Sequence, residues 1–307
     1  PIVILCLLFW VVGRKRPEHG QIYGKEGMVI VALAWILWSL FGAMPFTLSG
    51  YIPSYVDAFF ETVSGFTTTG SSIIPDVEVL PHCLLFWRSF THWIGGMGVL
   101  VFILSLLPLT GGYHMNLMKA ESPGPSVSKL VPHVKDTAKI LYGIYIAITI
   151  CEATILRALG MPLFDSLTTT FGTVGTGGFG IRNDSIAGYS PAIQITITVF
   201  MILSGINYTA YFYILTGKIK ELFKIEEVRW YLAIIFGSVA VITWNVRSLY
   251  PTFSETLRHA FFQVGSIITT TGYATTDFDL WPALSKTLLV TLMFIGACAG
   301  STSGGIK

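Results

Sequence analysis

Long apolar segments alternate with shorter, more polar segments along the whole chain. Apolar runs fill residues 28–48, 84–107, 140–159, 192–215 and 231–246, and a last run begins near residue 284 and continues to the end. Runs of about 20 residues are long enough to cross a bilayer as helices. The pattern therefore predicts an all-α polytopic membrane protein.

Within each pair of runs lies a segment that is too short or too polar to cross a membrane. These segments cover residues 54–66, 162–172 and 252–268. Backbone that enters a membrane without crossing it is tolerated only where protein surrounds it, so we expect three re-entrant half-helices. The chain then repeats one unit three times: a span, a half-helix and a second span.

These units and their linkers divide the chain. We expect the end of an N-terminal helix and a cytoplasmic linker at 1–27, repeats at 28–107, 140–216 and 231–307, and cytoplasmic linkers at 108–139 and 217–230. The third repeat is truncated in its second span. The first residues have no basic start typical of a cleavable signal peptide, and we interpret them as the tail of a longer helix.

A phrase rich in threonine and glycine follows each half-helix. It reads TTTG at 67–70, VGTG at 174–177 and TTTG at 269–272. The first and third copies align without a gap, because an Ala-Phe-Phe triplet lies twelve positions before the final glycine in both. The middle copy is the looser match. A phrase repeated in one context predicts a structural unit arranged around an axis.

Backbone carbonyls of these phrases are suited to bind a dehydrated cation. A desolvated alkali ion must replace its hydration oxygens, and a ring of carbonyl dipoles can supply them. Glycine allows backbone conformations that a Cβ atom would forbid, and we expect threonine to keep the strand extended. The negative C-terminal end of each half-helix would point toward the ion.

Composition supports a membrane protein and excludes several other classes. Hydrophobic residues make up 52% of the chain and charged residues 12%, whereas soluble proteins carry about a quarter charged residues. The net charge of +2 is too small to indicate nucleic-acid binding. The four cysteines show no metal-site or disulfide spacing, and no cluster of acids, histidines or nucleophiles predicts an enzyme.

The distribution of charge predicts the orientation. Twelve of the nineteen basic residues lie in three linkers: Arg14, Lys15, Arg16, Lys25, Lys119, Lys129, Lys135, Lys139, Lys218, Lys220, Lys224 and Arg229. Positive loops mark the cytoplasmic side. Nine acids surround the half-helices instead: Asp57, Glu61, Asp76, Glu78, Asp165, Asp184, Glu255, Asp277 and Asp279. They either form a vestibule that concentrates cations or simply occupy outer loops.

Several stretches resemble the Trk/Ktr/HKT superfamily of potassium transporters, over nearly the whole chain. Residues 64–70 resemble its first filter loop, 175–179 its second and 270–273 its third, and 93–98 resemble its first inner helix. Residues 120–125 resemble a cytoplasmic linker of the Trk type. The resemblance implies repeated span–pore-helix–filter–span units around a central pore, as in potassium channels, with three of an expected four present.

The resemblance also implies which residues form the filter and the gate. Potassium would bind at Thr68, Thr69, Gly70, Gly175, Thr176, Gly177, Thr270, Thr271 and Gly272. A glycine-rich interruption of the third inner helix would act as an intramembrane gate: Gly300, Ser301, Thr302, Ser303, Gly304 and Gly305, with Lys307 below it. Members of the family that favour sodium carry serine at the first filter glycine. Glycine at 70, 177 and 272 therefore implies potassium.

Family resemblance sets the expected function and partners. We expect potassium uptake across a bacterial inner membrane, with a cation symporter of alternating access, coupled to Na⁺ or H⁺, as the alternative. Because the repeats share one orientation rather than being inverted, the channel-like mechanism is favoured. The resemblance implies a homodimer in the membrane that docks a cytosolic, TrkA-like nucleotide-binding subunit. We expect no cofactor in this chain, which resembles a fragment of the TrkH/TrkG branch.

Some residues allow two interpretations. Glu152, at mid-span, either pairs with Arg157 or another helix, which we prefer, or takes part in conduction. Asn207 either bonds across helices or faces the pore. Arg88 more plausibly holds the filter loop than meets the ion. The remaining candidates, which we interpret as structural, are Gly95, Gly96, Gly98, His82, His92 and His259.

Overall fold

The computed structural model describes residues 24–98, 134–218 and 225–306, and all of its regular elements in these ranges are helices. Three of the helical stretches are long and apolar enough to cross a membrane: Met28–Leu48, Lys139–Ala158 and Glu226–Val246. The first and second agree closely with the predicted spans, and the third begins five residues before the prediction. The chain is therefore a helical, multi-pass membrane protein.

The first group of helices contains α2 (Gly24–Gly42), α3 (Met44–Leu48), α4 (Tyr55–Phe66) and α5 (His82–Gly96), with the 3₁₀ turn η1 (Val77–Val79) before α5. The short helix α4 begins where the side chain of Ser54 accepts a hydrogen bond from the N–H of Asp57, a typical N-cap. The predicted span at 84–107 is helical to Gly96. Most of its remainder lies outside the described residues.

The second group contains α8 (Val134–Ala158), α9 (Leu163–Val174), α10 (Pro191–Ser204) and α11 (Tyr208–Leu215). The predicted span at 192–215 is broken, because α10 and α11 are bent by 93° relative to each other. The break falls at Gly205, and Asn207 caps the new helix by accepting a hydrogen bond from the N–H of Thr209 at 2.9 Å. Its side chain thus has a local structural role.

The third group contains α13 (Glu226–Val246), α14 (Phe253–Ile268), η2 (Phe278–Leu280) and α15 (Ala283–Ile295). The last span was predicted to continue toward the end of the chain with an interruption at 300–305. The helix instead ends at Ile295, because Gly296 takes a φ of 68° that ends helical hydrogen bonding. Residues 296–306 form an irregular segment, which we call the inner loop.

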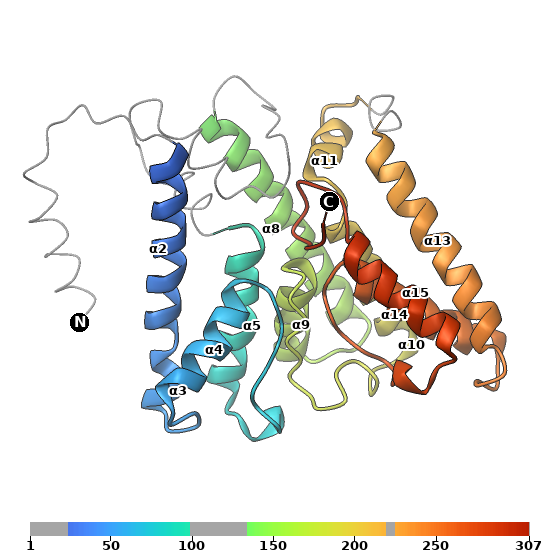
Figure 1. The fold of residues 1–307 in the computed structure, drawn as a ribbon, viewed down its shortest axis with the longest axis horizontal. Coiled ribbons are helices and arrows are strands. Elements are labelled where there is room, and N and C mark those ends of the chain that lie inside the picture. The colour runs from blue at the N-terminus through green and yellow to red at the C-terminus, as the bar shows by residue number, and fades with distance from the viewer. Residues whose placement is uncertain (1–23, 99–133, 219–224, 307) are drawn as a thin grey trace, which may run out of the picture.

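The three groups share one direction. Figure 1 shows the N-terminal ends of α2, α8 and α13 at one end of the molecule, which we call the inner end, and the loops containing η1 and η2 at the opposite, outer end. The short helices of the second and third groups also pack against the preceding group, since α9 contacts α5 and α14 contacts α10. The same neighbour contact therefore recurs from one group to the next.

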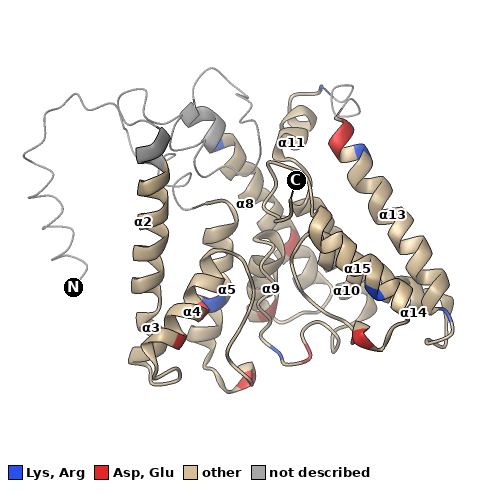
Figure 2. Ribbon diagram, viewed as in Figure 1, with Lys and Arg blue, Asp and Glu red and all other residues tan. Residues whose placement is uncertain are grey.

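Charged side chains differ between the two ends. Figure 2 shows acidic residues on the outer loops, whereas Glu226 and Glu227 lie at the inner end of α13. The basic linkers predicted to be cytoplasmic fall largely outside the described residues. Lys139 lies near the start of α8 and Lys218 follows α11, and Figure 1 shows both of these helix ends at the inner end, in agreement with the predicted orientation.

Candidate functional site

All three short helices end in the same hydrogen-bonded turn. After α4, the N–H of Thr69 donates to the carbonyl of Ser64 at 2.9 Å, and the N–H of Thr68 donates to that of Gly65 at 3.1 Å. Equivalent bonds after α9 and α14 join Gly177 to Gly172 and Thr176 to Thr173, and Thr271 to Ser266 and Thr270 to Ile267. This pair of bonds is a Schellman motif. We name residues 67–70 turn 1, 175–178 turn 2 and 269–272 turn 3.

A threonine in each turn takes a left-handed backbone conformation. The φ angle is 53° at Thr68, 54° at Thr176 and 55° at Thr270. We expected threonine to keep this segment extended, and that expectation is wrong because the Schellman motif needs a positive φ just after the helix. A β-branched residue is strained there, at about 1–3 kcal/mol. The same strain therefore recurs at one register in all three turns.

The turns also establish the register of the middle copy. Two residues after the left-handed threonine stands a glycine with positive φ: 75° at Gly70, 75° at Gly178 and 87° at Gly272. Gly178, rather than Gly177, is therefore equivalent to Gly70 and Gly272. Adjacent glycines in the middle copy concealed this register in the sequence. Because position 178 is also a glycine, all three turns still have glycine at the equivalent position. The prediction of potassium over sodium, which was based on that glycine, is therefore unchanged.

Neighbouring turns approach each other backbone to backbone. A Cβ atom on Gly70 would collide with the carbonyl oxygen of Gly177, and one on Gly178 would collide with that of Thr271. Gly177 and Thr271 hold the same position in their turns, directly before the final glycine. Around Gly272 there is open space within the described part of the chain. Turn 2 thus lies between turn 1 and turn 3 and approaches each of them through equivalent turn positions.

Backbone carbonyls of the turns are left free. Within the three described ranges, no hydrogen bond reaches the carbonyl oxygens of residues 68–70, 176–178 or 270–272. One position earlier, the carbonyls of Gly175 and Thr269 each lie 2.7 Å from the hydroxyl of the following threonine. Free carbonyls must find water or a cation. The arrangement therefore suits coordination of a dehydrated ion by oxygen.

A buried ion pair connects turns 1 and 2. Arg88 Nε lies 2.6 Å from Glu61 Oε1, and both side chains are almost fully buried. Glu61 also accepts hydrogen bonds from the hydroxyl of Ser72 and the N–H of Ile73, at 2.9 and 3.1 Å. Arg88 donates to the carbonyl of Gly180 at 2.8 Å. Glu61 therefore braces the backbone after turn 1 and does not face an outer vestibule, while Arg88 holds the loop after turn 2.

Helix α5 packs closely behind the turns. His92 Nδ1 lies 2.8 Å from the carbonyl oxygen of Gly65. A Cβ atom on Gly95 would collide with the carbonyl of Phe66, and one on Gly96 would meet the backbone of turn 2. These contacts agree with the structural interpretation of His92 and with close packing, rather than a hinge, at the two glycines.

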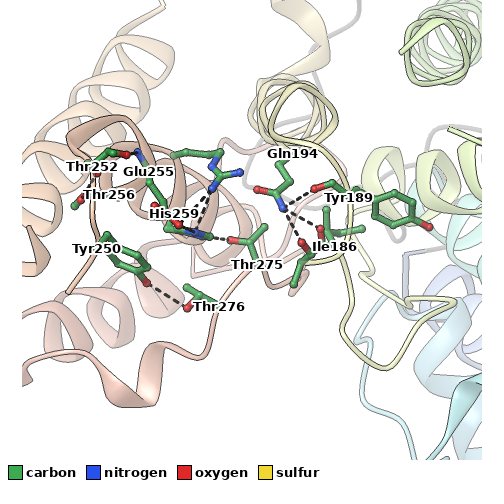
Figure 3. A network of polar contacts seen from close by, with 12 residues as sticks. Ile186, Tyr189, Gln194, Tyr250, Thr252, Glu255, Thr256, His259, Thr275 and Thr276 are labelled. Carbon is green, nitrogen blue, oxygen red and sulfur yellow. Dashed lines mark hydrogen bonds and ion pairs between the residues drawn. The ribbon is translucent and has the colours of Figure 1, made fainter. Parts of the chain in front are cut away.

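Side chains of α14 and of the loop before it fix the segment after turn 3. His259 Nδ1 lies 3.0 Å from the hydroxyl of Thr275, and Tyr250 Oη lies 3.2 Å from that of Thr276, as Figure 3 shows. Gln263 Nε2 donates to the carbonyl of Thr276 at 2.9 Å. Gln263 stands nine residues before the final glycine of its turn, as Glu61 does in the first unit. Both side chains brace the backbone that follows the turn.

The outer loop of the second unit folds on itself. Gln194 Nε2 donates to the carbonyls of Ile186, Ala187 and Tyr189 at 3.1–3.2 Å, as Figure 3 partly shows. Tyr189 Oη donates to Asp165 at 2.8 Å. Burial raises the pKa of the Tyr189 phenol, and its bond to Asp165 adds to the effect. The phenol therefore stays protonated as a donor.

That same loop is bonded to both neighbouring units. Asn183 Nδ2 donates to Asp76 at 2.7 Å in the first unit. The N–H of Ile186 donates to the carbonyl of Ala274 at 3.1 Å, and the N–H of Ala274 donates to the hydroxyl of Ser185 at 3.2 Å. The outer ends of the three units are therefore connected directly.

The inner loop lies against turns 2 and 3. Thr176 Oγ1 lies 3.0 Å from the carbonyl of Thr302, and the N–H of Gly304 donates to Thr270 Oγ1 at 2.8 Å. The loop thus contacts both left-handed threonines. Lys307, predicted to act with this loop, lies outside the described residues.

The break between α10 and α11 accommodates the inner loop. The N–H of Tyr208 donates to the carbonyl of Gly300 at 3.0 Å, and the N–H of Cys298 donates to that of Gly205 at 3.1 Å. The hydroxyl of Thr302 donates to the carbonyl of Ser204 at 3.2 Å. Two irregular segments at membrane depth thereby satisfy each other's backbone groups, as a membrane requires.

Glu152 does not form the predicted pair with Arg157. Its side chain is fully buried, and neither carboxyl oxygen has a hydrogen-bond partner within the described residues. Arg157 donates instead to the carbonyl of Met161 at 3.3 Å. Glu152 lies on α8, which packs against α9 behind turn 2, and nothing in the structure assigns it to an ion path.

Known proteins with similar sequences and structures are membrane transport proteins. The chain is 38% identical over 312 residues to the Trk system potassium uptake protein TrkH of Salmonella typhimurium, covering all of this chain and 64% of that protein. It is 35% identical over 316 residues to TrkG of Escherichia coli. The crystal structure of the potassium transporter TrkH from Vibrio parahaemolyticus superposes with a TM-score of 0.83 at 32% identity, covering 99% of this chain and 63% of that one.

The family assignment covers nearly the whole sequence. A profile of the TrkH family, described as cation transport protein, matches residues 3–307. This match agrees with the resemblance found in the turns and excludes the interpretation as an enzyme. The chain spans 64% of the length of the first relative. From its sequence and its helical membrane fold, the chain belongs to the TrkH family of cation transport proteins.

Proposed function

We propose that this chain forms three quadrants of a four-part potassium pore and takes part in potassium uptake across a bacterial inner membrane. The free carbonyls of residues 68–70, 176–178 and 270–272 carry this proposal. They recur at one register, on three adjacent turns, at the C-terminal ends of three short helices. Carbonyl oxygens in this arrangement replace the hydration shell of an alkali ion, and the membrane potential would drive its entry.

Shared geometry supports the proposal that these residues form the filter. The Schellman bonds hold each turn at the end of its helix, where the helix dipole is negative and favours a cation. The filter residues are Thr68, Thr69, Gly70, Gly175, Thr176, Gly177, Thr270, Thr271 and Gly272, and the backbone register adds Gly178. Glycine at positions 70, 178 and 272 supports potassium rather than sodium as the ion, by resemblance to the family.

The inner loop is the proposed gate. Residues 300–305 belong to it, and its bonds to Thr176 and Thr270 place it against two of the three turns. Irregular backbone at membrane depth must line a cavity or contact protein, and a loop directly inside a filter would obstruct ion exit. Opening would require these bonds to break or rearrange.

Serine substitution at the filter glycines tests the filter. In the full-length protein we expect Gly70→Ser and Gly178→Ser to lower potassium-over-sodium selectivity, because a side chain at either position meets the carbonyl of the next turn. The readout is growth of potassium-uptake-deficient cells at low external potassium, together with Rb⁺ and Na⁺ uptake. Unchanged selectivity in both variants, at normal membrane expression, would sink the filter assignment.

A symporter with alternating access is the second candidate. The 93° break between α10 and α11 and the end of α15 at Gly296 are discontinuous helices of the kind that transporters use. The common direction of the three units favours the channel-like mechanism. Single-molecule flux that saturates at a low turnover and depends on a Na⁺ or H⁺ gradient would favour the symporter.

The remaining proposals concern partners. By resemblance to the family, the protein would form a homodimer in the membrane and dock a TrkA-like nucleotide-binding ring at its inner end. Cross-linking in native membranes would test the dimer, and co-purification with the cytosolic subunit would test the ring.

A further inference from the structure

A buried aromatic side chain follows the last glycine of turns 2 and 3. Phe179 and Tyr273 are exposed by only 2% and 1%. The residue at the equivalent position after turn 1 is Ser71, which is exposed in the described part of the chain. Aromatic rings are large and rigid, and a buried tyrosine hydroxyl usually finds a hydrogen-bond partner. The contacts of these two rings therefore bear on how neighbouring turns are held.

Tyr273 reaches from turn 3 into the second unit. Its hydroxyl donates to the carbonyl of Thr169 on α9 at 3.1 Å and lies 3.4 Å from the carbonyl of Phe179, directly after turn 2. A Cβ atom on Gly172 would collide with Tyr273 Oη, so glycine leaves room for the hydroxyl at that point. The carbonyl of Gly172 also accepts the N–H of Gly177 that closes turn 2. Tyr273 thus contacts the backbone that holds turn 2 on its helix.

The backbone of Tyr273 is fixed to its own turn. Ser266 Oγ donates to the carbonyl of Tyr273 at 2.6 Å. The carbonyl of Ser266 accepts the N–H groups of Thr271 and Gly272 at 2.9 and 3.3 Å. Ser266 therefore joins turn 3 and Tyr273 to α14, and the hydroxyl of Tyr273 joins this assembly to turn 2.

Phe179 makes the corresponding contact between turn 2 and the first unit. The guanidinium carbon of Arg88 lies 3.6 Å from the centre of its ring, and the ring of His92 lies 4.1 Å from it, centre to centre. Both partners belong to α5. A cation over an aromatic face is attracted to the whole ring, whereas a hydrogen bond requires a narrow range of distance and angle. The hydroxyl of Tyr273 therefore fixes its distance more sharply than the ring of Phe179 does.

We propose that Tyr273 is a positioning residue for ion selectivity, whose hydroxyl holds turn 3 at a fixed separation from turn 2. The two turns approach so closely that a Cβ atom on Gly178 would collide with the carbonyl of Thr271. A small shift of turn 3 therefore changes the spacing between the carbonyls of both turns, and carbonyl geometry governs which dehydrated ion is bound. This inference rests on the proposed filter and names a side chain that sets its geometry without contacting the ion.

Tyr231 provides a matched control. Its hydroxyl also donates to a backbone carbonyl, that of Ile202 at 3.1 Å, and its side chain is buried. This bond joins α13 to α10 and involves none of the three turns. Tyr231→Phe therefore removes the same group and a bond of the same length as Tyr273→Phe does. Because both variants should lose similar stability, ion selectivity separates a positioning role from general loosening of the fold.

Uptake by the full-length protein in proteoliposomes tests the proposal. We expect Tyr273→Phe to lower the Rb⁺/Na⁺ uptake ratio by up to about fivefold, the effect of one neutral hydrogen bond on an equilibrium. The ratio of Tyr231→Phe should equal that of the wild type. Melting temperatures of the two variants in detergent, measured in parallel, should be similar. An equal fall of the ratio in both variants would overturn the proposal.

The filter variants Gly70→Ser and Gly178→Ser separate the two levels of the hypothesis. If they lower the Rb⁺/Na⁺ ratio and Tyr273→Phe does not, the positioning role is wrong and the filter stands. If they leave the ratio unchanged, the filter itself is wrong, and the role of Tyr273 fails with it. Should Tyr273→Phe not reach the membrane, Ser266→Ala decides, because it releases the carbonyl of Tyr273. A ratio equal to that of Tyr231→Phe would then overturn the proposal.

Discussion

Individual residues at the turns combine strain with close packing. Thr68, Thr176 and Thr270 occupy a conformation that β-branched residues normally avoid. Such conformations persist only when the surrounding structure over-determines them. Here the helix ends hold the backbone from one side, and His92 and the Glu61–Arg88 pair support it from behind. Residues that never contact an ion should therefore affect selectivity and stability together.

The Glu61–Arg88 pair allows a sharp prediction at this scale. Removing one partner leaves a buried, uncompensated charge, so Arg88→Leu should lower the free energy of unfolding by about 3–5 kcal/mol. In the third unit, Gln263 is equivalent to Glu61, counted back from the last glycine of the turn. Leu289 is equivalent to Arg88, counted from the proline that precedes α5 and α15. Both Gln263 and Leu289 are buried. The double variant Glu61→Gln with Arg88→Leu copies that neutral solution. It should recover much of the loss.

Thermal unfolding of the purified protein in detergent measures this effect. The informative comparison is between Arg88→Leu and the double variant. A double variant no more stable than Arg88→Leu would show that Arg88 acts through Gly180 rather than through charge neutralisation.

Helices could be predicted from the sequence where neighbouring residues determine their ends. The three short helices were located nearly to the residue, because a long apolar run on either side and the Thr/Gly phrase after it bound each segment. The break at Gly205 was missed, since a continuous apolar run conceals a bend that is stabilised by a distant loop. The register of Gly178 was missed because two adjacent glycines look alike in sequence.

Close packing at the break between α10 and α11 is also testable. A Cβ atom at position 205 would collide with the hydroxyl of Tyr231 and press on Thr269 and Ala297. Overpacking of this kind costs about 1–3 kcal/mol, so Gly205→Ala should lower the melting temperature. Adding Tyr231→Phe removes the colliding oxygen, and the pair should lose less than the sum of the two single variants. Strict additivity in a double-mutant cycle would argue against this contact.

At the scale of the whole molecule, the outer loops join the units. Asn183 bonds to Asp76, and Ser185 and Ile186 bond to Ala274. Asn183→Ala should lower the free energy of unfolding by about 1–2 kcal/mol, since it removes hydrogen bonds that are partly exposed. The N–H of Val77 donates a hydrogen bond to Asn183 Oδ1 at 3.0 Å, so its hydrogen exchange should be faster in the variant. Exchange at the N–H of Ile186, which bonds to the third unit, should remain as slow as in the wild type. If exchange there were accelerated as much as at Val77, the bonds to the first and third units would not be independent of each other.

These outer connections have a consequence for how the molecule can move. Units that are bonded to one another at their outer ends are held together most firmly there. Relative displacement of the units is then smallest at the outer loops and larger toward the inner end, where α13 begins. If the turns form the proposed filter, their carbonyl–carbonyl distances would change less than the spacing of the helices at the inner end. Ion selectivity and conductance could then vary independently.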